Sequence, residues 1–153
     1  MNHIVIAANP YRDIGLQKAV TVYRMLTEHG HQVIISPVFS PKAYLPDDIS
    51  PQPLAEAAQD AGLIIVMGGD GTILHLAKLA ALHKIPMLGI NMGGLGFLAE
   101  LEVGSLNALR GLKNWDFPIE ERMMLDVSVL RDGKQIYTNC LLYTSPSPRD
   151  KRQ

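Results

Sequence analysis

Residues 63–72, with the sequence LIIVMGGDGT, decide how this chain folds. The first half of the stretch is apolar without alternation, which indicates a strand buried on both faces, as in the middle of a parallel sheet. Its glycines end the strand, and residues 73–84, rich in Ala and Leu, are predicted to be a helix. A buried strand that turns directly into a helix is the repeating unit of parallel α/β proteins.

The segments on either side repeat this unit. Short apolar runs predict strands at residues 4–8, 31–36 and 86–90, and helical periodicity predicts helices at residues 13–30, 54–61 and 105–114. Residues 37–53 are rich in proline and are predicted to be a surface loop. The alternation predicts an α/β domain over residues 1–117, with an open, mostly parallel, Rossmann-like sheet covered by helices on both faces.

The pattern changes after Pro118. Apolar and polar residues alternate along 123–129, Asp132-Gly133 is a strong turn signal, and residues 135–138 resume a strand. Residues 118–141 are therefore predicted to be an antiparallel hairpin that opens a β-rich second domain which the chain does not complete. Residues 142–153 are polar, lack periodicity and are predicted to be a disordered, non-native tail.

Composition excludes several classes of protein. The 153 residues are 47% hydrophobic and 19% charged, as in globular domains, and the net charge of −1 provides no basic field for nucleic acid. The single cysteine, Cys140, cannot form an internal disulfide. No apolar run approaches the roughly 20 residues of a membrane span, and no signal peptide is recognisable. We therefore expect a cytoplasmic protein without membrane or nucleic-acid partners.

The first glycine cluster, Gly68-Gly69-Asp70-Gly71-Thr72, has the composition of a phosphate site. Glycines let backbone N–H groups approach a phosphate closely, and a helix N-terminus favours negative charge. Asp70 would repel a phosphate unless it accepted a proton from an attacking hydroxyl or held a metal ion. Thr72 could cap the helix or contact a phosphate. The alternative is a tight turn with a helix cap and no ligand.

A second cluster, residues 91–98 (NMGGLGFL), follows the strand at 86–90. Asn91 and the glycines would shape the turn, and Phe97 could pack against a nucleobase; alternatively, Phe97 belongs to the core. His75, five residues after Asp70, could reach a ribose or a phosphate, or it could be structural. Asn9-Pro10 ends the first strand at the same edge, a position at which a binding role is possible but unspecific. Neither Cys/His metal spacing nor a P-loop lysine motif is present.

These two clusters resemble those of the bacterial NAD kinases. The pentapeptide at 68–72 also occurs in diacylglycerol and sphingosine-type lipid kinases and has a near relative in phosphofructokinases, whereas the Asn-x-Gly-x-Leu-Gly-Phe-Leu pattern at 91–98 favours NAD kinase. The resemblance extends from the first strand to about Cys140. It implies transfer of the γ-phosphate of ATP, or of polyphosphate in some members, to the 2′-hydroxyl of the adenosine ribose of NAD, with a divalent metal such as Mg²⁺.

The resemblance also implies roles for individual residues. Asp70 would accept the proton of the ribose hydroxyl, Phe97 and Leu98 would line the adenine pocket, and His75 would also contact NAD. The complete set of implied substrate-binding residues is Gly68, Gly69, Asp70, Gly71, Thr72, His75, Asn91, Phe97 and Leu98, with no protein metal ligand among them. The full-length protein is expected to be a homo-oligomer.

One departure from the family pattern concerns residues 141–144, which are Leu-Leu-Tyr-Thr where NAD kinases continue Ala-Leu-Asn-Asp or Ala-Leu-Asn-Glu. Because the Asn-acid pair grips the dinucleotide in the family, this chain is predicted to be an inactive fragment of a kinase. Two alternatives stay open at this point: a lipid- or sugar-kinase relative that shares the pentapeptide, and a non-catalytic module that binds NAD or ATP.

Overall fold

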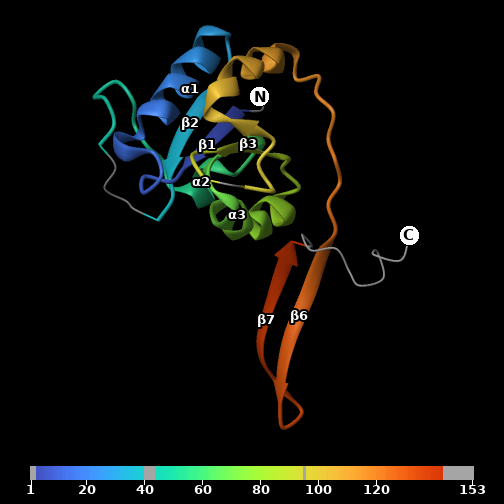
Figure 1. Ribbon diagram of the computed structural model, residues 1–153. Helices are drawn as coiled ribbons and strands as arrows, with labels where there is room; N and C mark the ends of the chain where they lie inside the picture. Colours follow the sequence, from blue (N-terminus) through green and yellow to red (C-terminus); the bar gives the residue numbers. More distant parts are fainter. Residues whose placement is uncertain (1–2, 40–43, 95, 143–153) are drawn as a thin grey trace. The chain divides into compact units, whose positions relative to one another are not determined.

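The computed structural model describes residues 3–39, 44–94 and 96–142 (Figure 1). The predicted tail lies outside this part of the chain from residue 143 onward. The contacts of the chain divide it into two compact units, Met1–Ile119 and Glu120–Gln153, which are described separately here. Within the described residues, no helix has the length and apolarity needed to cross a bilayer.

The first unit is built on a parallel sheet. Its strand order is β2-β1-β3-β4-β5, and every neighbouring pair is parallel. This confirms the predicted fold class. The last strand was not predicted because it is only two residues long. The strands are β1 (His3–Ala8), β2 (Val33–Pro37), β3 (Ala61–Gly68), β4 (Met87–Asn91) and β5 (Leu101–Glu102).

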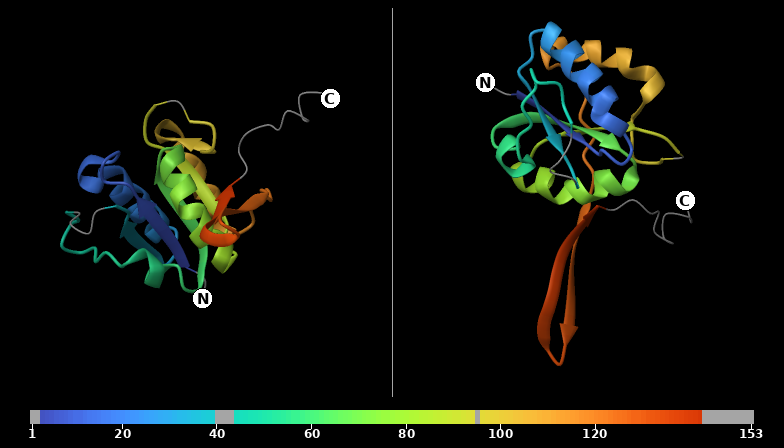
Figure 2. Two further views of the ribbon diagram at one scale, coloured as in Figure 1. Left: turned by 90° about the horizontal axis from the view of Figure 1, so that it is seen from below. Right: turned by 90° about the vertical axis from the view of Figure 1, so that its left-hand side faces the viewer.

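Helices cover both faces of this sheet (Figures 1 and 2). On one face lie α1 (Gln17–Glu28), which follows the 3₁₀ turn η1 (Ile14–Leu16), and the helical segment η2 (Val103–Asn114). On the other face lie α2 (Leu54–Ala57) and α3 (Asp70–His83). The helix predicted at 54–61 is shorter than expected because residue 61 already enters β3, and the helix predicted at 105–114 is a 3₁₀ helix.

Successive core side chains of each strand point to opposite faces of the sheet, because the backbone of a strand is pleated. In β1, Ile4 and Ile6 pack with α1, whereas Val5 packs with the side chains of α3; all three are fully buried. In β3, Ile65 faces the α1 side and Ile64 the α3 side. The two central strands are therefore buried on both faces, which explains their unbroken apolar sequences.

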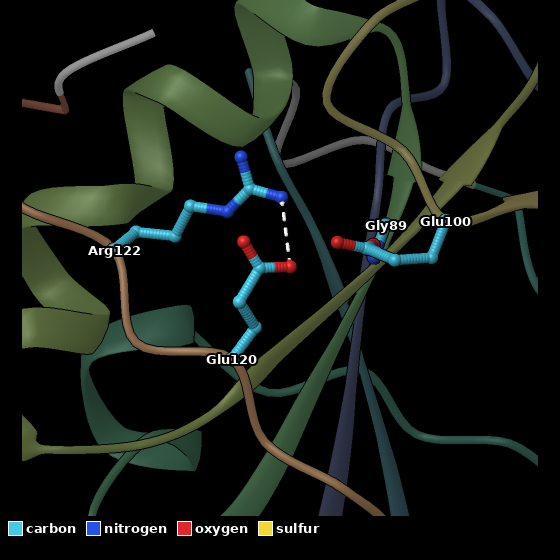
Figure 3. A network of polar contacts seen from close by, with 4 residues as sticks. All are labelled: Gly89, Glu100, Glu120 and Arg122. Carbon is cyan, nitrogen blue, oxygen red and sulfur yellow. Dashed lines mark hydrogen bonds and ion pairs between the residues drawn. The ribbon is translucent and has the colours of Figure 1, made fainter.

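The second unit is a hairpin of β6 (Met124–Arg131) and β7 (Lys134–Leu142), paired antiparallel as predicted. Its turn places Asp132 and Gly133 at φ values of 50° and 74°, the backbone of a type I′ turn. Just before β6, an exposed ion pair joins Arg122 Nη2 to Glu120 Oε2 at 3.2 Å (Figure 3).

Candidate functional site

The topology of the sheet places several loops at one edge. The chain leaves β1 for the outer strand β2 by way of α1, and it leaves β3 for β4 by way of α3 on the opposite face. The carboxyl ends of β1 and β3 therefore form a topological switch point, where open α/β sheets bind ligands. Asn9 follows β1 there, residues 69–70 follow β3, and Asn91 ends β4 alongside.

The turn after β3 is locked by a buried contact with the end of β1. Asn9 Nδ2 donates a hydrogen bond to Thr72 Oγ1 at 3.0 Å, and both side chains are buried. A Cβ at Gly68 would overlap the Thr72 hydroxyl, so only glycine fits there without a shift. The cap role that the sequence allowed for Thr72 is not observed, because α3 has no side-chain cap bond and this hydroxyl is directed instead to Asn9.

The other two glycines of the turn are in a different situation. A Cβ on Gly69 or Gly71 would meet no atom within 4 Å, and neither residue has a positive φ. The fold therefore requires a glycine at neither position. The space that their missing side chains leave open borders Asp70, the first residue of α3.

Asp70 is the link between the two glycine clusters. Its carboxylate accepts the backbone N–H of Phe97 through Oδ2 at 3.0 Å and that of Leu98 through Oδ1 at 3.2 Å. A Cβ on Gly96 would lie 3.1 Å from the Oδ1 atom, which explains the glycine at that position. Each carboxylate oxygen has a second lone pair, so Asp70 can still accept a hydrogen bond from a ligand hydroxyl.

Asn91 shapes the second cluster from within. Its Nδ2 donates to the carbonyl of Gly94 at 2.8 Å, and its Oδ1 accepts the N–H of Gly93 at 3.3 Å. Gly93 and Gly94 adopt φ values of 131° and 84°, which favour glycine. Farther along, Glu100 Oε2 accepts the N–H of Gly89 at 2.9 Å and so holds the end of this loop to β4 (Figure 3).

The remaining predicted residues lie around this turn. Phe97 is 83% exposed, so the alternative that placed it in the core is wrong. Leu98 is half-buried and packs against the α3 face of the sheet. His75 is exposed on α3. The centroid of its ring lies 4.7 Å from the ring centroid of Phe39, which belongs to the loop after β2.

Sequence reasoning assigned no definite role to Asn9 and overlooked Glu100. The available signal for Asn9 was its position directly after a buried strand; for Glu100 there was none, because its partner is a backbone amide. Within the described residues, no three His, Cys, Asp or Glu side chains gather into a metal-binding group.

A doubly wound parallel sheet, with two glycine turns joined by Asp70 at its switch point, defines an α/β domain of the class that binds ligands at the carboxyl edge of the sheet. The chain belongs to the NAD kinase family: the family model described as the ATP-NAD kinase N-terminal domain matches residues 4–111.

Named relatives agree with this assignment. The chain is 36% identical over 137 residues to the NAD kinase of Ruminiclostridium cellulolyticum, covering 89% of this chain and 47% of that protein. It is 38% identical over 144 residues to the NAD kinase of Natranaerobius thermophilus, covering 90% and 48% respectively. The chain thus spans about half the length of these relatives.

Among solved structures, the yeast NADH kinase complexed with NADH is similar, with a TM-score of 0.65 and 18% sequence identity. The likeness covers 93% of this chain and 46% of the yeast chain, and it establishes that the fold is shared.

Proposed function

We propose that the chain is the nucleotide-binding, catalytic half of an NAD kinase, which transfers the γ-phosphate of ATP to the 2′-hydroxyl of the adenosine ribose of NAD. The observation that carries this proposal is the open space at Gly69 and Gly71, which neither sterics nor backbone angles explain. A ligand that approaches the backbone closely does explain both glycines.

In the proposed reaction, Asp70 accepts the proton of the ribose hydroxyl. The new bond joins that oxygen to the γ-phosphorus, the bond to the bridging oxygen of ADP breaks, and the proton passes to the Asp70 carboxylate. Asp is a weak base at neutral pH, but phosphoryl transfer has a loose transition state that mainly needs positioning and neutralisation of charge. The hydrogen bonds from Phe97 and Leu98 support this role because they hold the carboxylate in one orientation.

The surrounding residues would bind the substrate. The exposed ring of Phe97 would pack on the adenine with Leu98 beneath it, and His75 would contact the ribose or a phosphate. Divalent Mg²⁺ fits such a site because it takes substrate phosphates with few protein carboxylates as ligands. When bound, the ion would neutralise phosphate charge. Either ATP or polyphosphate could serve as the donor.

We further propose that residues 1–117 form the catalytic α/β domain and that residues 118–141 open a β-rich second domain. Because residues 141–144 depart from the family pattern, we expect the chain on its own to be inactive in this transfer reaction. Its partners would be small nucleotides in the cytoplasm, and the full-length protein would be a homo-oligomer. The match along residues 4–111 does not favour the lipid- or sugar-kinase alternative.

Catalysis can be tested in a chimera in which residues 1–140 replace the matching segment of the Ruminiclostridium cellulolyticum NAD kinase. We expect the chimera to form NADP from ATP and NAD, and Asp70→Asn to lower kcat by at least about 100-fold, because a general base contributes that much or more. The matched control is Asp60→Asn, at an exposed turn residue. NADP formation at an unchanged rate in Asp70→Asn would refute the proton-acceptor role.

Asp70 also accepts two backbone hydrogen bonds from the second glycine cluster, so Asp70→Asn could lower kcat by displacing this loop. The amide resonances of Phe97 and Leu98 separate the two effects: if they keep their positions in the variant, the loss of rate is chemical. A chimera that binds NAD but never forms NADP, even without a substitution, would favour the non-catalytic module instead.

A further inference from the structure

Asn9, the first residue after β1, is held in place by its backbone. Its N–H donates a hydrogen bond to the carbonyl of Met67 in β3 at 2.9 Å, which continues the pairing of the two central strands. Its carbonyl accepts the N–H groups of Arg12 and Asp13 at 3.0 and 2.9 Å. The position of Asn9 is therefore fixed from two sides, by the sheet and by the turn that follows β1.

The side-chain amide of Asn9 is oriented as well. Its Oδ1 accepts the backbone N–H of Tyr11 at 3.0 Å, and its Nδ2 donates to Thr72 Oγ1 at the same distance. Turning the amide over would place its NH₂ group against the Tyr11 N–H, and the first of these bonds would be lost. Asn9 is 8% exposed and Thr72 is 4% exposed, so water has little access to the contact between them.

Thr72 belongs to the turn that carries Asp70. Its backbone N–H donates to the carbonyl of Gly69 at 2.9 Å, and this bond closes the first turn of α3 around Asp70 and Gly71. Among the described residues, no side chain caps the N-terminus of α3. Because the ends of helices fray readily, the position of this uncapped turn depends on contacts from outside the helix, and the contact with Asn9 is one of them.

The other external contacts of the turn are made by the Asp70 carboxylate, which accepts the backbone N–H groups of Phe97 and Leu98. The bond to Phe97 is exposed and the bond to Leu98 is partly buried, whereas the bond between Asn9 and Thr72 is buried. A hydrogen bond is electrostatically stronger where water is excluded. The buried contact with Asn9 is therefore the firmer of the two attachments of the turn.

We propose that Asn9 is a positioning residue for Asp70 and that it acts through the Thr72 hydroxyl. By joining the end of β1 to the first turn of α3, Asn9 sets where the carboxylate stands at the switch point of the sheet. The consequence for catalysis rests on the proposed function, in which Asp70 accepts the proton. The placement of the turn does not depend on the reaction and is tested separately.

The placement is tested in the 153-residue chain by ¹⁵N-resolved NMR and hydrogen exchange. In Asn9→Ala we expect the amide resonances of Asp70 and Phe97 to shift, because the turn and the loop bonded to it move together. The amide of Thr72 should exchange at least about tenfold faster, because the first turn of α3 opens more often. Resonances of Asp70 and Phe97 that stay in place would overturn the proposal.

The effect on catalysis is tested in the chimera described above, at saturating NAD and ATP. A displacement of about 1 Å can lower a rate by roughly 100-fold, and we expect Asn9→Ala to lower kcat about tenfold. Thr72→Val, which lacks the hydroxyl, should lower kcat by a similar factor, and Thr72→Ser should recover most of that loss. Because both changes break one contact, the double variant should be no slower than the slower single variant.

The matched control is Ser36→Ala. Ser36 is fully buried in β2, and its Oγ donates to the carbonyl of Gln52 at 2.8 Å. The loss of this bond should lower the urea midpoint but leave kcat and the Asp70 resonance unchanged. An equal loss of kcat in Ser36→Ala would show that Asn9 affects stability alone.

Two further results separate this proposal from its alternatives. Losses of kcat that multiply in the double variant would show that Thr72 acts independently of Asn9, and would overturn the proposal. If the unsubstituted chimera forms no NADP, the proposed function fails, and the resonance of Asp70 alone decides whether Asn9 places the turn. Should Asn9→Ala not fold, Thr72→Val and Thr72→Ser supply the same comparison of resonances and of kcat.

Discussion

At the scale of single residues, the three positions of the first turn are occupied by glycine for different physical reasons. Gly68 is needed because the Thr72 hydroxyl occupies the place of a side chain, whereas Gly69 and Gly71 face open space. The sequence shows that glycines cluster here, but it cannot separate these reasons. The separation depends on Asn9, which lies 63 positions away from Thr72 and holds its hydroxyl.

This difference predicts that alanine substitutions at Gly71 and Gly68 change the free energy of unfolding in opposite directions. Gly71→Ala should raise the free energy of unfolding by about 0.5 kcal/mol, because alanine is the better helix residue, and should weaken NAD binding at least tenfold by blocking close approach. Gly68→Ala should lower the free energy of unfolding by about 1–3 kcal/mol through overlap with Thr72. Urea unfolding and calorimetry measure the two effects. NAD affinity unaffected by Gly71→Ala would show that the open space has no ligand.

At the scale of elements, the start of α1 shows how periodicity can mislead. The sequence predicts a helix from Asp13, yet α1 begins at Gln17, because Gly15 and Leu16 adopt φ values of 66° and 51°. Leu16 is nevertheless buried on the same face as the helix, so the apolar spacing continues through a segment that is not α-helical. Asp13 reaches past this turn to the helix N-terminus.

Asp13→Ala should therefore destabilise the fold as the loss of a helix cap does. The backbone N–H of Ala19, buried against the Asp13 carboxylate at 2.8 Å, would lose its acceptor, and the free energy of unfolding should fall by about 1–2 kcal/mol. The control is Asp47→Ala, at an exposed aspartate, with an expected change within about 0.5 kcal/mol. Equal stabilities of the two variants in urea would contradict the cap.

At the scale of the first unit as a whole, an aromatic contact ties its last helical segment to the sheet. Trp115, just after η2, packs edge-to-face on His31, just before β2, with ring centroids 5.6 Å apart. Among the described residues, the buried Nε2 of His31 has no hydrogen-bond partner. Burial lowers the pKa of His31 below its usual 6.5, and the neighbouring His29 lowers the pKa further.

The lowered pKa predicts a loss of stability in mild acid. The folded state keeps His31 neutral, while the unfolded chain takes up a proton near pH 6.5, so the free energy of unfolding should decline as the pH falls below about 6.5. The only tryptophan of the chain, Trp115, reports unfolding by its fluorescence. His31→Gln should reduce this pH dependence and the exposed-site control His83→Gln should not; an unchanged profile in His31→Gln would refute the assignment.

The sequence by itself determined the parallel α/β class, the position of both glycine turns and the closing hairpin. It could do so because hydrophobic periodicity and turn chemistry act between residues a few positions apart. Tertiary structure decided which groups meet: the Thr72 hydroxyl with Asn9, and the Asp70 carboxylate with the backbone amides of Phe97 and Leu98. These encounters depend on the strand order β2-β1-β3-β4-β5, which brings distant segments to one edge and leaves no local pattern in the chain.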